Sequence, residues 1–137
     1  MAVNTRLGVA ARNAAVDAIV GTIGASGKMR IYDGTQPTDA DTALGAQVLL
    51  ADLALSATAF GASSSGTATA NAITTDSSAD ASGTASWGSF TTSANVRKID
   101  FSVGTATSNL ILNSVAISAG AAVAVTAFTA TIPMQGA

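Results

Sequence analysis

The chain has 137 residues, contains no cysteine and no histidine, and carries a formal net charge of −2 with only 10% charged residues. This composition excludes a disulfide framework and a thiolate metal site, and it removes the commonest general base and the best nucleophile. The six basic residues are scattered, whereas nucleic-acid binding requires clustered Lys and Arg. We therefore expect neither an enzyme nor a nucleic-acid partner.

More than half of the residues are Ala, Gly, Ser or Thr. Each buried Ala removes little apolar area from water, so the expected core is thin for a domain of this length. Such a chain gains stability by burying further surface against a partner or against copies of itself. We expect one domain, with a helix and linker over residues 1–27 and a β-sandwich over residues 28–137.

The first predicted element is a helix over residues 4–20, with Asn4 or Thr5 as its N-cap and Gly21 and Gly24 at its end. Small apolar residues at helical spacing form the expected packing stripe, which consists of Leu7, Ala11, Ala14, Ala15, Ala18 and Ile19. The charges in this region argue against a signal peptide, and no apolar window is long enough to span a bilayer. We expect no membrane partner.

Alternation of apolar and polar residues then predicts several strands. The first four cover residues 28–33, 47–58, 67–75 and 84–91. A polar loop is expected over residues 36–46 and a flexible connection over 61–66, while Gly88 is expected to mark a bulge.

No residue from Phe101 to Ala137 is charged, but apolar residues still alternate there with Ser, Thr, Asn and Ala. This pattern predicts strands over 96–103, 110–112, 115–117 and 122–132, with a bend at Asn113 and Ser114 and an end at Pro133. Seven or eight strands separated by frequent turns favour a mainly β protein, built as an antiparallel, jelly-roll-like sandwich.

Two segments bear a superficial likeness to catalytic or ligand-binding motifs. Residues 24–28 resemble a phosphate-binding loop, but Thr22 replaces its first Gly, Met29 replaces its Mg²⁺ ligand, and the loop follows a helix rather than a strand. Ser26 and Lys28 form a Ser-Lys pair without a neighbouring base. We interpret the whole segment as a linker.

The acidic residues are the remaining candidates for metal ligands. Asp33, Asp39 and Asp41 form the densest group, followed by Asp76 and Asp80. Neither group has the spacing of a known calcium loop, and Asp in turns usually accepts backbone hydrogen bonds. We expect turn residues here and no metal or other cofactor.

The single Trp and one adjacent basic pair are the other notable features. Trp87 is expected in the core, and the alternative is that Trp87 and Phe90 anchor an interface. Arg97 and Lys98 are expected to decorate a strand end or to pair with an Asp.

Several stretches resemble a group of small phage and prophage virion proteins. They are AARNAA at 10–15, MRIYDGTQP at 29–37, LLADL at 49–53, ANAIT at 70–74, GTASW at 83–87 and the paired-strand pattern of 110–132. The resemblance implies a capsid cement or decoration protein, located on the outside of the capsid after assembly in the host cytoplasm. Such proteins have small jelly-roll or sandwich folds and often form trimers, so the implied partners are the major capsid protein and other copies of this chain.

The residues proposed to contact the shell are Arg6, Arg12, Arg97 and Lys98. A tail, baseplate or connector component is the first alternative function. A host-glycan-binding module is the second, and it requires an exposed aromatic residue such as Trp87 or Tyr32.

Overall fold

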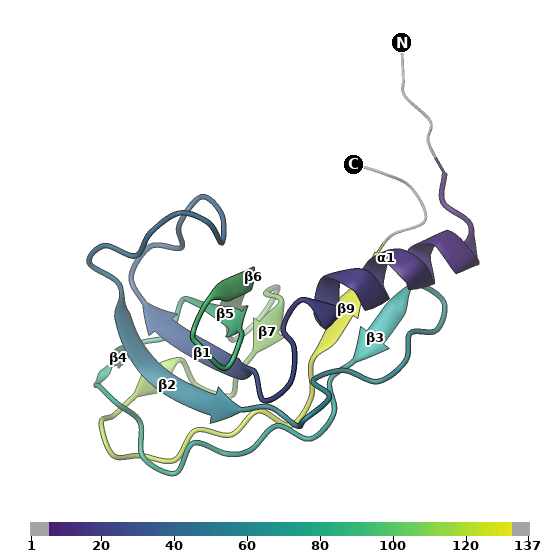
Figure 1. Cartoon of the computed structure of the whole chain (residues 1–137). Helices are drawn as coiled ribbons and strands as arrows, with labels where there is room; N and C mark the ends of the chain where they lie inside the picture. Colours follow the sequence, from purple (N-terminus) through teal and green to yellow (C-terminus); the bar gives the residue numbers. More distant parts are fainter. Residues whose placement is uncertain (1–5, 133–137) are drawn as a thin grey trace.

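The computed structural model describes residues 6–132, which form a mainly β protein with one helix (Figure 1). The helix is α1 (Val9–Gly21), and the strands are β1 (Lys28–Asp33), β2 (Val48–Ala54), β3 (Thr67–Thr69), β4 (Gly83–Thr84), β5 (Trp87–Thr91), β6 (Arg97–Gly104), β7 (Leu110–Ile111), β8 (Ala116–Ile117) and β9 (Thr129–Thr131). The predicted mainly β class with an N-terminal helix is confirmed. The predicted N-cap residues Asn4 and Thr5 and the strand end at Pro133 lie outside the described residues.

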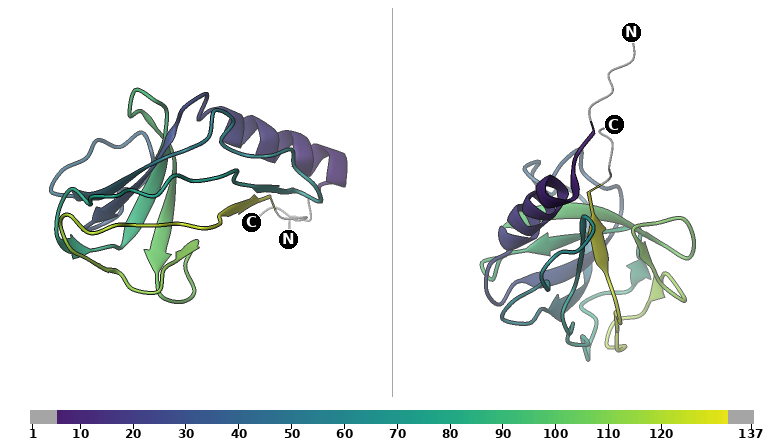
Figure 2. Two further views of the ribbon diagram at one scale, coloured as in Figure 1. Left: turned by 90° about the horizontal axis from the view of Figure 1, so that it is seen from below. Right: turned by 90° about the vertical axis from the view of Figure 1, so that its right-hand side faces the viewer.

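The centre of the fold is a five-stranded sheet in the order β2-β1-β5-β6-β7. Its neighbours are antiparallel except β6 and β7, which are parallel. The register shifts at Ile31/Tyr32 and at Phe90/Thr91, and such bulges increase the local twist, which fits the curled sheet of Figure 2. Two short sheets, β3-β9 and β4-β8, and several isolated bridges add to the strand pairing.

Gly88 was predicted to form a bulge, and this prediction is wrong. Its pairing is regular, opposite Ile31 on one side and Phe101 on the other. A Cβ atom on Gly88 would lie 2.6 Å from the Phe101 ring and 2.9 Å from the Arg30 carbonyl oxygen. Glycine is therefore required at this position because a side chain has no room.

Helix α1 lies beside β3 and β9 at one end of the molecule (Figures 1 and 2). Its buried residues are Arg12, Val16 and Val20, which are spaced four residues apart. The predicted stripe of small residues is therefore wrong, and Ile19 is 42% exposed. The helix begins later than expected, at Val9, where Gly8 is the N-cap in an extended conformation.

An aromatic cluster lies at the centre of the core. Phe90 is fully buried, and its ring contacts Phe60, Phe101 and Phe128 at centroid distances of 5.3, 5.1 and 4.8 Å. These rings come from the central sheet, from the loop before β3 and from the segment before β9. The cluster therefore joins the five-stranded sheet to the end of the molecule that carries α1.

The C-terminal third contains less strand than its alternation predicts. Residues 122–132 form one isolated bridge at Val123 and the short β9, rather than one long strand. A bend occurs at Asn113, as predicted, between β7 and β8. No helix in the described part of the chain is long and apolar enough to cross a membrane.

Candidate functional site

One face of the central sheet collects the polar side chains of four strands. Asp52 on β2 lies opposite Arg30 on β1, Arg30 lies opposite Ser89 on β5, and Ser89 lies opposite Asp100 on β6. Alternation along each strand places these four residues on the face opposite Phe90 and Phe101. The sheet therefore has an apolar face toward the core and a row of polar side chains on its other face.

Ion pairs neutralise the charges along this row. Arg30 donates from Nε and Nη2 to Oδ2 of Asp52 at 3.1 and 2.9 Å, and Lys28 Nζ lies 3.8 Å from the same oxygen. Arg97 Nη1 donates to Oδ2 of Asp100 at 2.7 Å. The Arg97 and Asp100 side chains are only 7% and 5% exposed, so this pair is almost completely removed from water.

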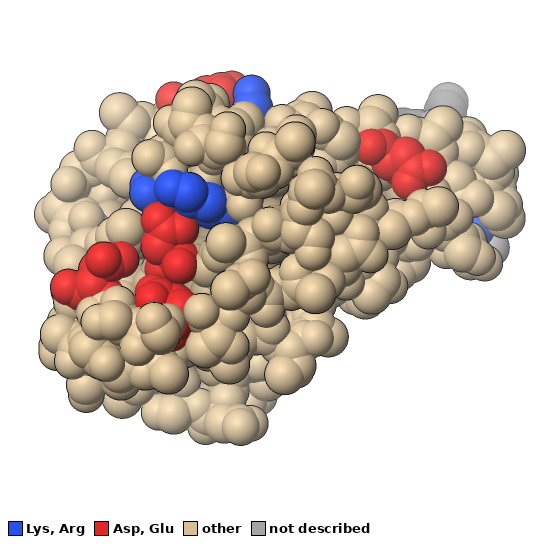
Figure 3. Space-filling model, turned by 60° about the horizontal axis from the view of Figure 1, so that its bottom comes forward, with Lys and Arg blue, Asp and Glu red and all other residues tan. Residues whose placement is uncertain are grey.

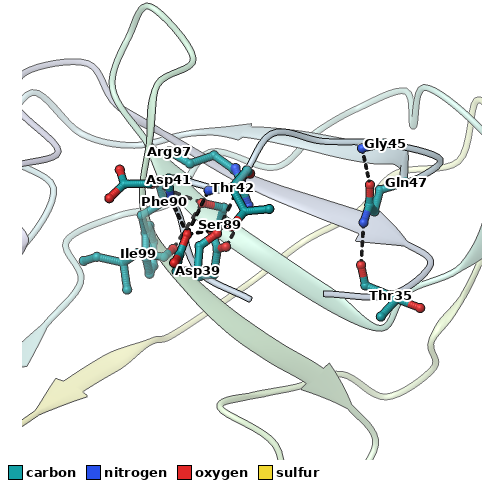
Figure 4. Close-up of polar contacts among 11 residues, drawn as sticks. Thr35, Asp39, Asp41, Thr42, Gly45, Gln47, Ser89, Phe90, Arg97 and Ile99 are labelled. Carbon is teal, nitrogen blue, oxygen red and sulfur yellow. Dashed lines mark hydrogen bonds and ion pairs between the residues drawn. The ribbon is translucent and has the colours of Figure 1, made fainter. Parts of the chain in front are cut away.

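Arg97 also connects the sheet to the loop between β1 and β2. Its guanidinium carbon lies 5.5 Å from the centroid of the Trp87 ring, and Trp87 in turn stacks on Tyr32 at 4.4 Å. Nη2 of Arg97 donates to the carbonyl oxygens of Thr42 and Asp39, as Figure 4 shows. The prediction that Arg97 pairs with an Asp is confirmed, and its partner is Asp100.

The side chain of Asp39 forms hydrogen bonds with neighbouring residues of the same loop. Its Oδ1 accepts hydrogen bonds from the backbone N–H and the hydroxyl of Thr42, each at 2.8 Å, and from the backbone N–H of Asp41 at 3.1 Å (Figure 4). The hydroxyl bond of Thr42, followed by its backbone bond, lowers the pKa of Asp39. Asp39 is therefore a turn residue, as the sequence predicted.

Two of the other predicted acidic candidates, Asp33 and Asp76, also bind backbone groups. Asp33 accepts hydrogen bonds from the N–H groups of Gly34 and Thr84, and Asp76 accepts them from those of Asp52 and Ser78. Within residues 6–132, no group of three or more His, Cys, Asp or Glu side chains is placed to hold a metal ion.

The Ser-Lys motif does not form a reactive pair. Ser26 occupies a tight turn with a φ of 55°. Lys28 Nζ instead binds the side chain of Asn95 at 3.0 Å and faces Asp52. The segment joins α1 to β1, in agreement with its interpretation as a linker.

The four basic residues predicted to contact a shell divide into two kinds. Arg6 and Lys98 are exposed. Arg12 is only 9% exposed and donates to the carbonyl oxygen of Ser65 at 3.0 Å, and Arg97 is held as described above. Arg12 and Arg97 are thus structural residues whose charged groups face into the chain, which corrects the expectation that Arg12 reaches outward.

The loop over residues 61–66 was predicted to be a flexible connection, but helix α1 holds it. Ser63 donates through its backbone N–H to Asp17 and through its hydroxyl to the carbonyl oxygen of Asn13. The side-chain oxygen of Asn13 accepts from the Gly66 N–H at 2.8 Å. In the sequence, only the polar side chains of α1 hinted that this loop is held by the helix. Their partners could not be identified because they lie about 50 residues further along the chain.

The burial of the two candidate aromatic residues weakens the alternative of glycan binding by stacking. Trp87 is 0% exposed and Tyr32 is 2% exposed. The prediction that Trp87 belongs to the core is confirmed, and Phe90 is buried as well.

Much of the face drawn in Figure 3 is uncharged. Figure 3 shows charged side chains gathered in a few patches, surrounded by a broad area without charge. Large apolar residues are also exposed at separate points, namely Val9, Ile19, Leu44, Val48, Val96 and Ile111. The surface hollows include a groove of ≈ 370 Å³ between the end of α1 and residues 57–62, and a second groove of ≈ 240 Å³ between β6 and β9.

Comparison with known proteins found no matching family model, no matching curated protein and no matching solved structure.

Proposed function

We propose that this chain is a structural phage protein, specifically a capsid cement or decoration protein. In this role it binds the outside of the assembled shell and bridges and stabilises the major capsid subunits. The observation that carries the proposal is the uncharged surface, together with the absence of charge from Phe101 to Ala137. The resemblance of its sequence to small virion proteins points to the same role.

An uncharged surface of small side chains is suited to lattice binding. Few charged groups must be stripped of water when it docks, since Arg30 and Arg97 already have carboxylate partners. Many copies on a lattice gain avidity without strong individual contacts. If the chain binds the assembled shell better than its free subunits, mass action favours the assembled state. The proposal includes two further points. The chain forms a trimer, and its fold is a variant of the jelly roll.

Arg6 and Lys98 are the basic residues available for contact with an acidic shell surface, because both are exposed. The test is a double variant, Arg6→Glu with Lys98→Glu, in which the charge of both residues is reversed. We expect lower occupancy on purified particles, measured as the ratio of this chain to the shell protein. Ser78→Glu, at another exposed position, is the control. Unchanged occupancy of the double variant would remove these two residues from the interface.

The proposed function itself is tested by copy number. This chain is quantified against the major shell protein in purified particles, and particle strength is measured before and after its mild removal. Hundreds of copies whose loss weakens the shell would support a cement role. A dozen or fewer copies would indicate a tail, baseplate or connector component, and absence from particles would reject the virion role.

A further inference from the structure

The loop over residues 34–47 is long, but it buries none of its own side chains. It joins β1 to β2, and its two ends meet where Asp33 pairs with Val48. The structure describes every residue of this loop, and each is exposed or half-buried. Compact surface loops with adjacent ends are frequently functional, and segments with few buried contacts open at the lowest free energy. This loop is therefore well suited to move as a unit.

Hydrogen bonds give the loop a defined shape of its own. Asp39 accepts three of them from the residues two and three positions further along the chain. Gln47 donates to the Thr35 carbonyl oxygen and accepts from the Gly45 N–H, both at 2.7 Å (Figure 4). These bonds join residues of the loop to one another, so they do not depend on the sheet. A loop that keeps its shape when it leaves the sheet loses little conformational entropy when it closes again.

The same loop covers one end of the polar row on the central sheet. Side-chain exposure falls from 25% for Asp52 and 17% for Arg30 to 5% for Asp100 and 7% for Arg97. The loop lies at the buried end, where Arg97 Nη2 donates to two of its carbonyl oxygens (Figure 4). Among the described residues, these are the only hydrogen bonds that join residues 35–46 to groups outside the loop. Arg97 alone therefore holds the loop against the sheet by hydrogen bonding.

Two polar atoms at this covered end are buried without a partner. They are Oδ1 of Asp100 and Nε1 of Trp87, which form no hydrogen bond within residues 6–132. Asp100 binds Arg97 through its other oxygen, and Trp87 lies beneath the Arg97 guanidinium. A buried donor or acceptor without a partner is unfavourable. The closed arrangement therefore leaves one acceptor and one donor for a ligand that reaches this end of the row.

We propose that the loop over residues 34–47 is a lid, and that the sheet beneath it binds an extended peptide segment of another protein. With the lid open, Nη2 of Arg97 and Nε1 of Trp87 are free to donate, and Oδ1 of Asp100 is free to accept. A peptide backbone supplies carbonyl oxygens for both donors and an N–H for the acceptor. In the closed state, the lid's own backbone carbonyls occupy the place of the ligand at Arg97.

The charge of the site favours a peptide backbone over an anion. Arg97 is already neutralised by Asp100 at 2.7 Å, so a second carboxylate would add a buried charge without a partner. The lid itself shows that backbone carbonyl oxygens fit beside Arg97. This site goes beyond the proposed capsid role and does not depend on it. Both can be separated because the site is tested on the isolated chain.

The first test measures lid opening at Trp87, the single Trp of the chain. Its indole N–H gives one NMR signal, and exchange of that hydrogen with solvent reports opening. Asp39→Ala removes the acceptor that shapes the lid, so that closing must order the loop. Asp41→Ala removes the same charge from an exposed neighbour and is the control.

We expect indole exchange to be about ten-fold faster in Asp39→Ala than in Asp41→Ala, with unchanged exchange at the Phe90 amide of the central sheet. Equal indole exchange in the two variants would show that the lid does not control access to Trp87. Faster exchange at Phe90 as well would show that the sheet unfolds instead. Either result would overturn the proposal.

The second test adds a peptide to a chain that lacks the lid. Residues 34–47 are replaced by Asn-Gly, a preferred two-residue hairpin turn, and the probe is a peptide with the sequence of residues 35–46. A short tether supplies an effective concentration in the millimolar range, so we expect millimolar probe to slow the indole exchange. A scrambled peptide should have no effect. If circular dichroism shows that the shortened chain is unfolded, Asp39→Ala takes its place. No effect of the probe, or an equal effect of the scrambled peptide, would overturn the proposal.

Discussion

Arg97 lies over the face of Trp87, with 5.5 Å between the guanidinium carbon and the ring centroid, while the same guanidinium binds Asp100. One side chain therefore joins an aromatic stack, a buried carboxylate and the carbonyl oxygens of the loop between β1 and β2. Of these groups, the Asp100 carboxylate is the one that burial would otherwise leave without a cation.

Removal of this side chain is expected to destabilise the fold strongly. Arg97→Ala leaves the Asp100 carboxylate buried without its cation, which costs about 3–5 kcal/mol when a buried ion pair is broken. The free energy of unfolding, measured by urea denaturation, checks this expectation. The neighbouring Lys98→Ala is the control, because Lys98 is exposed and its loss should change stability by less than about 0.5 kcal/mol. Equal effects of the two substitutions would contradict the buried role of Arg97.

Gly88→Ala is expected to destabilise the central sheet by about 1–3 kcal/mol, because the added methyl group overlaps the Phe101 ring and the Arg30 carbonyl oxygen. Gly21→Ala provides a control of opposite sign. No atom outside the helix's own backbone and its chain neighbours lies within 4 Å of its added Cβ, and Ala in a helix is favoured over Gly by about 0.5–1 kcal/mol. Thermal unfolding of both variants tests the contrast, and a neutral Gly88→Ala would show that the ring can move aside.

Asp39 should make the loop between β1 and β2 sensitive to acid. Its pKa is lowered by the Thr42 hydroxyl bond, so the charged form favours the folded loop. The stabilisation is complete above the ordinary aspartate value of about 3.9, and it is lost as the pH falls through the lowered value. An NMR titration that follows the Thr42 amide is expected to report a midpoint below that ordinary value. Asp39→Asn should abolish the transition, and a midpoint at the ordinary value would contradict the hydrogen-bond arrangement.

Asn13→Ala is expected to release the loop over residues 61–66 from α1. The Gly66 N–H then loses its acceptor, at a cost of about 1–3 kcal/mol for a buried donor. Hydrogen exchange at the Gly66 amide should become faster, with little change at amides of β1 and β5. Ala14→Ser, at an exposed position of the same helix, is the control. Unchanged exchange at Gly66 would show that the contact does not hold the loop.

Phe90→Ala should cost about 3–5 kcal/mol, because it leaves a cavity at the meeting point of Phe60, Phe101 and Phe128. Phe90→Leu is expected to cost less, since it retains most of the volume. Urea denaturation orders the two variants, and similar losses would indicate that ring contacts matter more than filled volume.

Strands with large apolar residues could be located from the sequence. Strand β1 has the predicted bounds, and Arg97–Gly104 differs by one residue at each end from its predicted range. Large alternating side chains such as Met29 and Ile31 mark a buried face, and burial is what periodicity detects. Alternation does not report strand pairing, which explains why the segment over 122–132 contains only a short strand.

The contacts of Arg12 and Arg97 could not be predicted in the same way. A charged residue is expected at the surface, and both become buried only because distant groups, Ser65 and Asp100 among them, supply acceptors in the folded chain. Gly88 was misassigned for a related reason. A bulge and a close approach of a ring both favour glycine, and only the position of Phe101 distinguishes them.

The Asp76 carboxylate that covers the Asp52 N–H has a consequence for how the chain behaves in crowded solutions. Edge strands with free backbone groups drive proteins to aggregate as extended sheets. On this side of the molecule, protection comes from one side chain and two short loop contacts rather than from a complete strand. Resistance to insoluble assembly at high concentration therefore depends on a few atoms of the segment between Thr74 and Asp80.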